Sequence, residues 1–342
     1  MENTTTNKQG QQAVIENASV PTAPQEETTD VPRMGTFARI SALIREMRPR
    51  QWTKNGAVFI GLIFSQNLLN LVDCERALLA FITFCFASSS VYILNDLLDL
   101  EKDRQHPTKR LRPLASGQLP VSWAIGGMGV LLLLCAALII TLFELPSASH
   151  LYGNMGGANI LFTVTIVAYL LMNVLYTVRL KHVVLIDVFI IALGFVLRAL
   201  AGTLVIPAII SPWLYLVTSF LSLFLALSKR RHELVLLQGQ ASNHRKILKE
   251  YSIPMLDQMI TIVVAGTLMS YSLYTIEGPT GNQRLLVTVP FVLYGVFRYL
   301  YLVYMRMEGG SPDEVLLRDR PILVTVLLCT VLVVAVLYLR IL

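Results

Sequence analysis

Charge is scarce in this chain of 342 residues. Only 15% of the residues are Asp, Glu, Lys or Arg, whereas 54% are hydrophobic, and the mean hydropathy is +0.61. A water-soluble domain of this length carries far more charge, because its surface has to be hydrated. The composition excludes an ordinary soluble protein and predicts a polytopic membrane protein.

Paired cysteines are missing as well. None of the four cysteines forms a C-x-x-C pair with another, and the five histidines show no spacing typical of metal ligands. We therefore expect neither a disulfide framework nor a zinc site. The chain also has no soluble basic domain that could hold nucleic acid, so we assign its net charge of +6 to loops at a membrane surface.

Long apolar runs make up most of the sequence. Each is about as long as the 20 or so residues that a membrane-spanning helix needs, and the alternation typical of barrel strands is missing. Lipid-exposed backbone must satisfy its own hydrogen bonds, so every run predicts a helix. We expect nine transmembrane helices, at about 54–71, 76–95, 121–143, 156–176, 183–206, 213–228, 256–276, 285–305 and 321–341.

The segments between the runs predict an orientation. Lys and Arg are concentrated in alternate connections, whereas the short loops on the other side contribute only Arg76 and Arg284. By the positive-inside rule, we expect the N-terminus in the cytoplasm and the C-terminus outside. Residues 1–33 are rich in Thr, Gln, Asn, Pro and Glu and predict a disordered cytoplasmic tail, which leaves residues 34–342 as a single transmembrane domain.

An acidic cluster follows the second apolar run, in the stretch SSSVYILNDLLDLEKDRQHPTKRLRP at 88–113. Asp96, Asp99 and Asp103 are three and four residues apart, so a helix places them on one face, with Asn95 adjacent and Asp103 nearest to water. Three carboxylates on one face repel one another unless a cation lies between them, and Mg²⁺ prefers oxygen ligands. The alternative interpretation is a solvated helix end paired with nearby lysines and arginines.

Basic residues follow this cluster directly, namely Arg104, Lys109, Arg110 and Arg112. Together with two prolines they form a loop suited to binding phosphate. Carboxylates for a metal and basic groups for phosphate are the usual combination around a diphosphate leaving group. Asn95 and Asp96 directly follow an apolar stretch and are expected at or below the membrane surface, where an ionisable residue is costly and is a functional candidate by default. The stretch therefore predicts a Mg²⁺ and diphosphate site.

The sequence NDLLDLEKD matches the pattern N-D-x-x-D-x-x-x-D. In this it resembles the first aspartate-rich motif of the UbiA superfamily of intramembrane prenyltransferases, which also stands at the end of helix 2. The resemblance implies a helical bundle around a central cavity, open to the cytoplasm for a Mg²⁺-diphosphate and sideways to the bilayer for a polyprenyl chain. It implies that Asp96, Asp99 and Asp103, with Asn95, bind Mg²⁺.

A second aspartate-rich motif of typical members is replaced here. The place after the sixth run reads LALSKRRHEL, with Lys229 and Arg230 where a second metal site is expected, so we predict an additional phosphate there. In this respect the chain is similar to the decaprenyl-phosphate phosphoribosyltransferase branch. The shared segments are RPRQWTKN (48–55), DRQHPTKRLRPLASG (103–117), GFVLRALAG (194–202) and SPDEVLLRDRPIL (311–323).

This resemblance, over residues 45–342, implies an enzyme of a bacterial-type inner membrane and is compatible with a homotrimer. The implied donor is phosphoribosyl diphosphate, the implied acceptor is a polyprenyl phosphate, and diphosphate is released. A donor with a diphosphate and a separate 5-phosphate explains why one acidic and several basic groups are needed. The alternatives are an aromatic prenyltransferase of quinone biosynthesis, against which the missing second motif argues, and a transporter.

Further substrate contacts are predicted in three places. Lys54 and Asn55 begin the first run, where an interfacial anchor is the alternative. Tyr176, Lys181 and Asp187 lie at the connection between the fourth and fifth runs, where the basic residue also fits a topology signal. Arg198 lies inside an apolar run and needs a partner, for which we consider Asn159 or Asn173, or a place in the cavity.

Overall fold

The structure is a computed structural model. It describes residues 35–145, 156–206, 208–209, 211–237, 246–278, 283–310, 314–315 and 318–338. The predicted tail, residues 1–33, lies outside the described residues. So do Ser311, Pro312 and Asp313 of the segment 311–323.

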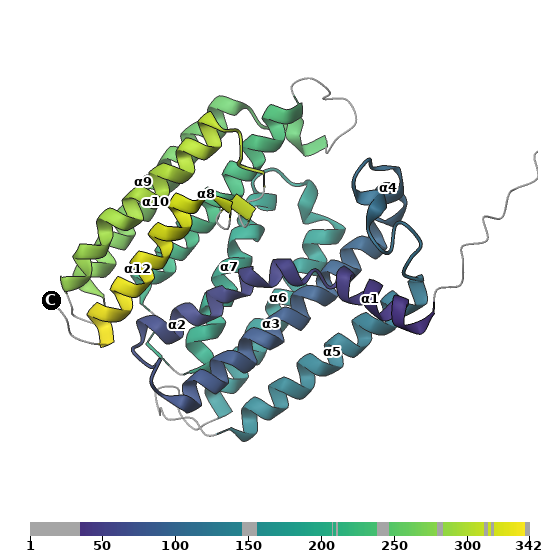
Figure 1. Cartoon of the computed structure of the whole chain (residues 1–342), viewed down its shortest axis with the longest axis horizontal. Coiled ribbons are helices and arrows are strands. Elements are labelled where there is room, and N and C mark those ends of the chain that lie inside the picture. The colour runs from purple at the N-terminus through teal and green to yellow at the C-terminus, as the bar shows by residue number, and fades with distance from the viewer. Residues whose placement is uncertain are drawn as a thin grey trace, which may run out of the picture. The chain divides into compact units, whose positions relative to one another are not determined.

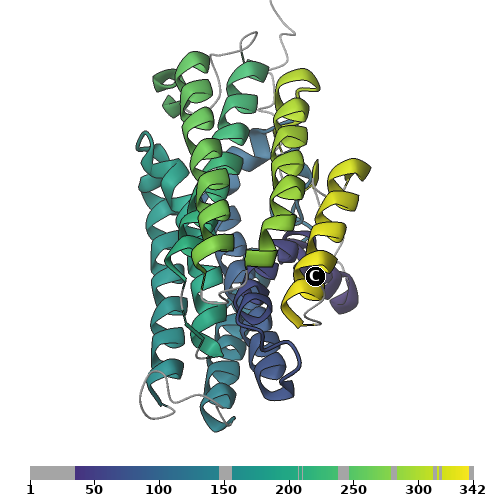
Figure 2. The same ribbon diagram turned by 90° about the vertical axis from the view of Figure 1, so that its left-hand side faces the viewer.

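The described regular structure is helical, and eight helical segments are long and apolar enough to cross a membrane. The prediction of an all-α polytopic membrane protein is confirmed. The long helices run alongside one another in the bundle (Figures 1 and 2). They are α3 (Leu71–Leu98), α5 (Val121–Glu144), α6 (Gly156–Val178), α7 (Ile186–Val205), α8 (Pro212–Leu237), α9 (Ile253–Glu277), α10 (Val289–Met305) and α12 (Arg320–Tyr338).

The first predicted span, 54–71, is not a single α-helix. It begins inside the 3₁₀ helix η1 (Pro49–Val58), continues as the short helix α2 (Phe59–Phe64) and ends in a turn before α3. Ten residues of 3₁₀ and six of α-helix extend about 29 Å, close to the thickness of the hydrocarbon core. The first span is therefore helical as predicted, but it is not one continuous α-helix. In place of the nine single helices that were predicted, the described residues form eight long helices and this composite segment.

Two glycines explain why this segment lies so close to α7. A Cβ atom at Gly202 would come within 1.9 Å of the Val58 carbonyl oxygen, and one at Gly61 within 2.8 Å of Thr203. Small residues let helix backbones approach in a membrane, where dispersion contacts rather than hydrophobicity drive association. The end of α12 also contacts α2, because the Tyr338 hydroxyl donates to the Ile63 carbonyl at 3.0 Å.

The helices form two groups on either side of α7. In Figure 1, α8, α9, α10 and α12 lie on one side and α3, α5 and α6 on the other. The short helices α1 (Thr36–Glu46) and α4 (Leu100–Gln105) lie at the end of the bundle where α3 finishes. Arg76, assigned from the sequence to a loop at the opposite end, lies inside α3 and is fully buried.

Candidate active site

The acidic cluster is built where α3 ends and α4 begins. Helical geometry is interrupted at Asp99, which separates the two helices, so the three carboxylates do not continue along one straight face. Asp96 and Asp103 are buried, whereas the Asp99 side chain is 31% exposed. The expectation that Asp103 is nearest to water is wrong, because the change of direction at Asp99 turns Asp103 under the following basic loop.

Asp96 and Asp103 converge on one cation. Nη1 of Arg112 lies 2.9 Å from Oδ1 of Asp96 and 2.5 Å from Oδ2 of Asp103. Arg48 pairs with the other oxygen of Asp96, and Nζ of Lys109 is 3.6 Å from Asp103. Two buried carboxylates that share one positive group can also share a metal ion, so their donor oxygens fit Mg²⁺.

Asp99 faces a different partner. Nζ of Lys181, in the short helix η3 (Leu180–His182), lies 2.9 Å and 3.1 Å from its two carboxylate oxygens. Burial acts to raise the pKa of Asp99, but the hydrogen bond and charge of Lys181 outweigh it, and the pKa is lower than usual. Among the described residues, no group of three acidic, histidine or cysteine side chains is arranged so that it could hold a metal ion.

Glu46, the last residue of α1, was not among the predicted site residues. Its carboxyl group is buried beside Asp96 and near the Leu114 backbone. Burial, followed by the contact with Asp96, raises the pKa of Glu46 to about 8. The signal was available, because Glu46 is the one acidic residue in the basic stretch 39–54.

Other predicted residues of this region lie around the acidic cluster or away from it. Asn95 accepts a hydrogen bond from the Thr177 hydroxyl of α6. The Lys54 ammonium contacts Gln51 within η1.

Arg104 is exposed and pairs with Glu101 at 2.8 Å, and the Arg110 side chain is exposed in the basic loop. The structure therefore brings Arg112 and Lys109 to the carboxylates and leaves Arg104 on the outside.

A second charged cluster joins α7 and α8. Arg230 and Asp187 are both buried and form an ion pair of 2.8 Å, and Arg230 also lies 2.5 Å from Glu233. The Tyr251 hydroxyl donates to Asp187 at 2.7 Å, and Tyr176 lies close to Arg230. Arg230 thus has two carboxylate partners, a contact that the sequence did not reveal. Lys229, which directly precedes Arg230 in α8, is exposed.

Arg198 and Asn55 form a buried link between α7 and η1. Nε of Arg198 donates to Asn55 at 2.7 Å, and its Nη2 donates to the Tyr169 hydroxyl at 2.8 Å. The predicted partners are wrong, since Asn173 donates to a carbonyl of its own helix and Asn159 accepts from Arg76. The contact could not be predicted from the sequence, because 143 residues separate Arg198 from Asn55.

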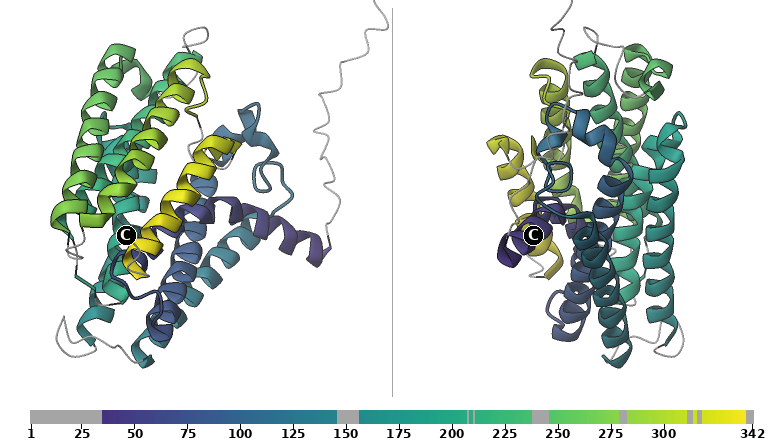
Figure 3. Two further views of the ribbon diagram at one scale, coloured as in Figure 1. Left: turned by 60° about the vertical axis from the view of Figure 1, so that its left-hand side comes forward. Right: turned by 90° about the vertical axis from the view of Figure 1, so that its right-hand side faces the viewer.

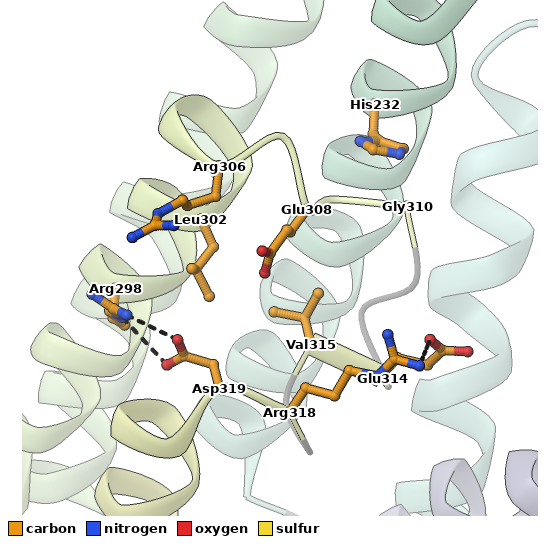
Figure 4. A pocket seen from close by; sticks show the side chains of 10 residues that line it. All are labelled: His232, Arg298, Leu302, Arg306, Glu308, Gly310, Glu314, Val315, Arg318 and Asp319. Carbon is orange, nitrogen blue, oxygen red and sulfur yellow. Dashed lines mark hydrogen bonds and ion pairs between the residues drawn. The ribbon is translucent and has the colours of Figure 1, made fainter.

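A cavity of about 550 Å³ lies between α8, α10 and the residues that precede α12 (Figure 4). We call it the charged cavity. Its lining includes His232 of α8, Arg298 in the middle of α10, Arg306 directly after α10, and Arg318 and Asp319 before α12. None of the three carboxylates of the acidic cluster lines it. The segment 311–323 was noted in the sequence, but no site was predicted from it.

The chain resembles proteins of one family over most of its length. A model of the UbiA prenyltransferase family matches residues 56–313. The decaprenyl-phosphate phosphoribosyltransferase of Corynebacterium glutamicum is 33% identical over 290 residues, which cover 81% of each chain. The protein of the same name from Mycolicibacterium smegmatis is 31% identical over 299 residues, covering 82% of this chain and 87% of that one.

The fold agrees with this result. A UbiA homolog from Archaeoglobus fulgidus bound to GPP and Mg²⁺ superposes with a TM-score of 0.63 at 17% identity, covering 86% of this chain and 99% of that chain. A digeranylgeranylglyceryl phosphate synthase superposes with a TM-score of 0.60. With its apolar helices, the chain is a multi-pass membrane protein, and it belongs to the UbiA prenyltransferase family.

Proposed function

We propose that this protein transfers 5-phosphoribose from phosphoribosyl diphosphate to a polyprenyl phosphate and releases diphosphate. The observation that carries the proposal is a pair of charged clusters at one end of the bundle, each of which combines carboxylates with basic groups. Asp96 and Asp103 share Arg112, whereas on α8 Arg230 pairs with Asp187 and Glu233, next to the exposed Lys229. The two relatives named above are decaprenyl-phosphate phosphoribosyltransferases.

The acidic cluster suits the diphosphate end of the donor. Asp96 and Asp103 would hold Mg²⁺, which supplies positive charge to the departing diphosphate. Arg48 and Arg112 border these carboxylates with side chains that are 28% and 30% exposed, so each can turn one face to a diphosphate oxygen. Lys181 holds Asp99 in place on the other flank and offers a further positive charge.

The reaction needs little proton transfer from the protein. An oxygen of the lipid phosphate forms a bond to C1 of the ribose while the bond from C1 to the diphosphate oxygen breaks, and the electron pair leaves with diphosphate. The second pKa of a phosphate monoester is about 6, so the acceptor is nucleophilic near neutral pH without a general base. The side chains described above therefore bind, orient and neutralise the two substrates.

We further infer that the acidic cluster faces the cytoplasm of a bacterial-type cell, at its inner membrane. The basic residues of α4 and the loop after it support this orientation through the positive-inside rule. Within the described residues, eight long helices and the composite η1–α2 segment make an odd number of crossings, which is consistent with a cytoplasmic N-terminus and an external C-terminus.

One assay of donor choice tests the function. Purified full-length protein is incubated with ribose-labelled phosphoribosyl diphosphate, Mg²⁺ and polyprenyl phosphate, and the organic phase is counted. We expect label in the lipid phase that depends on all three components. Absence of such label, together with turnover of a prenyl diphosphate and an aromatic acid, would replace the proposal by an aromatic prenyltransferase.

A further inference from the structure

The mechanism above does not use the charged cavity. One of its ion pairs belongs to the fold, because Asp319 holds Arg298 at 2.9 Å and also accepts from the Ile322 amide at 3.0 Å, at the start of α12. This pair fixes α10 against α12 and is not easily opened. Other charges of the cavity have to be considered as contacts for a ligand.

Two arginines at the rim are better placed for exchange. Arg318 pairs with Glu314 at 3.2 Å, but these side chains are 80% and 55% exposed, so the pair is weak. Arg306, at the end of α10, lies near Tyr301 and Glu308. Figure 4 shows Glu308 between the α10 side of the cavity and the Arg318 side. A phosphate can replace Glu314 at Arg318 and gain charge-assisted hydrogen bonds.

An apolar groove of about 300 Å³ adjoins the charged cavity along the same helices. It is lined by α8, α10 and α12. On α10, Val292, Val296, Tyr299, Leu302 and Arg306 follow one another at spacings of three or four residues and therefore lie on one face. The first three line the groove and the last two line the cavity, so one continuous stripe runs from apolar to charged.

The same change occurs along α12. Asp319 lines the charged cavity, and Ile322, one turn later, lines the apolar groove. Further along, the groove includes Val326 and Thr330, both of which are exposed, so a long chain can leave the groove sideways. A hollow with a charged end and an open apolar end fits an amphiphile with an anionic head group and a long hydrocarbon tail.

We propose that the acceptor binds here, with its phosphate between Arg306 and Arg318 and its polyprenyl chain in the groove between α8, α10 and α12. This inference rests on the proposed function, because it commits to a polyprenyl phosphate as the occupant. It assigns the donor diphosphate to the acidic cluster and the charged cavity to the phosphate of the loaded acceptor, which has to advance to C1 of the ribose for transfer. Both places lie at the same end of the bundle (Figures 1 and 3).

Gly295 allows a direct test of the groove. It lines the groove, and a Cβ atom there meets only Thr325 Cγ2 within 4 Å, at 3.9 Å. The substitution Gly295→Leu therefore places a side chain in the groove from a Cβ atom that meets no close contact. We expect the KM for a long-chain polyprenyl phosphate to rise at least about tenfold. We expect the KM for phosphoribosyl diphosphate and the thermal midpoint to stay unchanged.

Two controls sharpen this test. Gly129→Leu makes the same change in α5, where nothing lies within 4 Å of the added Cβ atom, and should leave both KM values unchanged. Geranyl phosphate provides a second control. Gly295 lies eleven residues, or about 16 Å of helix, from Arg306. The two isoprene units of geranyl phosphate are shorter than that, so Gly295→Leu should affect this acceptor least.

Two substitutions that change the net charge of the cavity in opposite directions test whether it binds the acceptor phosphate. Arg306→Gln removes a positive charge from the proposed phosphate contact and should raise the acceptor KM about tenfold. Glu308→Gln removes a negative charge from the same cavity and should lower it. Equal effects of the two changes, or a rise in both, would show that the cavity does not bind the acceptor phosphate.

A binding readout separates this inference from the proposed function. Full-length protein is labelled with a polyprenyl phosphate that carries a diazirine on its chain, and the labelled peptides are mapped. If the protein is active, the label lies outside α8, α10 and α12, and Gly295→Leu behaves like Gly129→Leu, then the groove is not the acceptor site. The proposed transfer reaction would still stand. If the protein is inactive but is labelled on α10 and α12, and Gly295→Leu loses the label, then the proposed transfer reaction is wrong. The groove would still be a binding site for the polyprenyl phosphate.

Discussion

Two fully buried arginines, at opposite ends of the bundle, are stabilised in different ways. Arg76 of α3 makes four hydrogen bonds, to the carbonyls of Leu142, Leu145 and Val205 and to the side-chain oxygen of Asn159. These carbonyls stand at the C-terminal ends of α5 and α7, where helix dipoles concentrate negative charge. Arg230 of α8 instead binds two carboxylates, Asp187 and Glu233.

The difference separates a structural arginine from one that can serve a reaction. The acceptors of Arg76 are fixed parts of two helices, so no ligand can replace them without opening those helix ends. The partners of Arg230 are side chains, and Glu233 is 29% exposed, so a phosphate can compete with it for the guanidinium. A buried cation held by backbone therefore indicates architecture, whereas one held by a partly exposed carboxylate indicates a candidate site.

Arg76→Met should have the largest effect on stability. It leaves three helix-end carbonyls and Asn159 without their donor, which should cost about 3–5 kcal/mol. We expect a large drop in the thermal midpoint of the detergent-solubilised protein. Activity per folded molecule should change little. A variant with normal stability and lost activity would assign Arg76 to the reaction and break the comparison.

Arg230→Met should be destabilising by a smaller amount, about 3 kcal/mol, because Tyr251 still donates to Asp187 and Glu233 can reach solvent. The double variant Arg230→Met/Asp187→Leu removes the unpaired carboxylate as well and should recover most of the thermal midpoint. Its turnover should remain low if Arg230 contacts a substrate phosphate. Recovery of both stability and turnover would reduce the pair to a structural role.

Asp96→Asn and Asp103→Asn should each lower turnover about 100-fold, or about 2.7 kcal/mol in the barrier, with the fold retained. Both carboxylates contact Arg112, and both are buried. Asp99→Asn should have a smaller effect, because Asp99 faces Lys181 and is partly exposed. Steady-state assays over a range of Mg²⁺ concentrations check this order, and a stronger defect in Asp99→Asn would reverse our assignment of the metal ligands.

Glu46 gives the smallest predicted effect, a dependence of stability on pH. Burial and Asp96 raise its pKa from 4.5 to about 8 in the folded protein. Between these values the folded state binds a proton that the unfolded chain has released, so stability should fall as pH rises from 4.5 to 8. Glu46→Gln should remove this loss, roughly 1–3 kcal/mol at pH 8. Thermal midpoints of the two proteins without Mg²⁺ should diverge with rising pH, and parallel curves would contradict the prediction.

The bundle could be predicted because lipid imposes a simple rule. A run of about 20 apolar residues must be helical in a bilayer, whatever it packs against, so composition alone located α3 and the seven long helical segments after it. The rule failed at 54–71, where the chain forms η1 and α2. There the close approach to Gly202 and Thr203 of α7 accompanies a mixed 3₁₀ and α geometry that no apolar pattern encodes.

The candidate site was only partly predictable. Asp96, Asp103 and Arg112 lie within 17 consecutive residues, so their association follows from local sequence. The interruption at Asp99, which buries Asp103, depends on the loop that folds over it. Glu46 was not predicted, because a single acidic residue in a basic helix is typical of an interfacial surface. Only the tertiary structure places it beside Asp96.

The sequence by itself determined which segments enter the membrane and that acidic and basic groups gather at one end, because both follow from transfer free energies of local composition. Only the tertiary structure decided which cation each carboxylate meets. Lys181 and Asp99 are 82 residues apart, and Arg48 and Asp96 are 48 apart. Coulombic and hydrogen-bond energies depend on separation in space, and helix packing sets that separation.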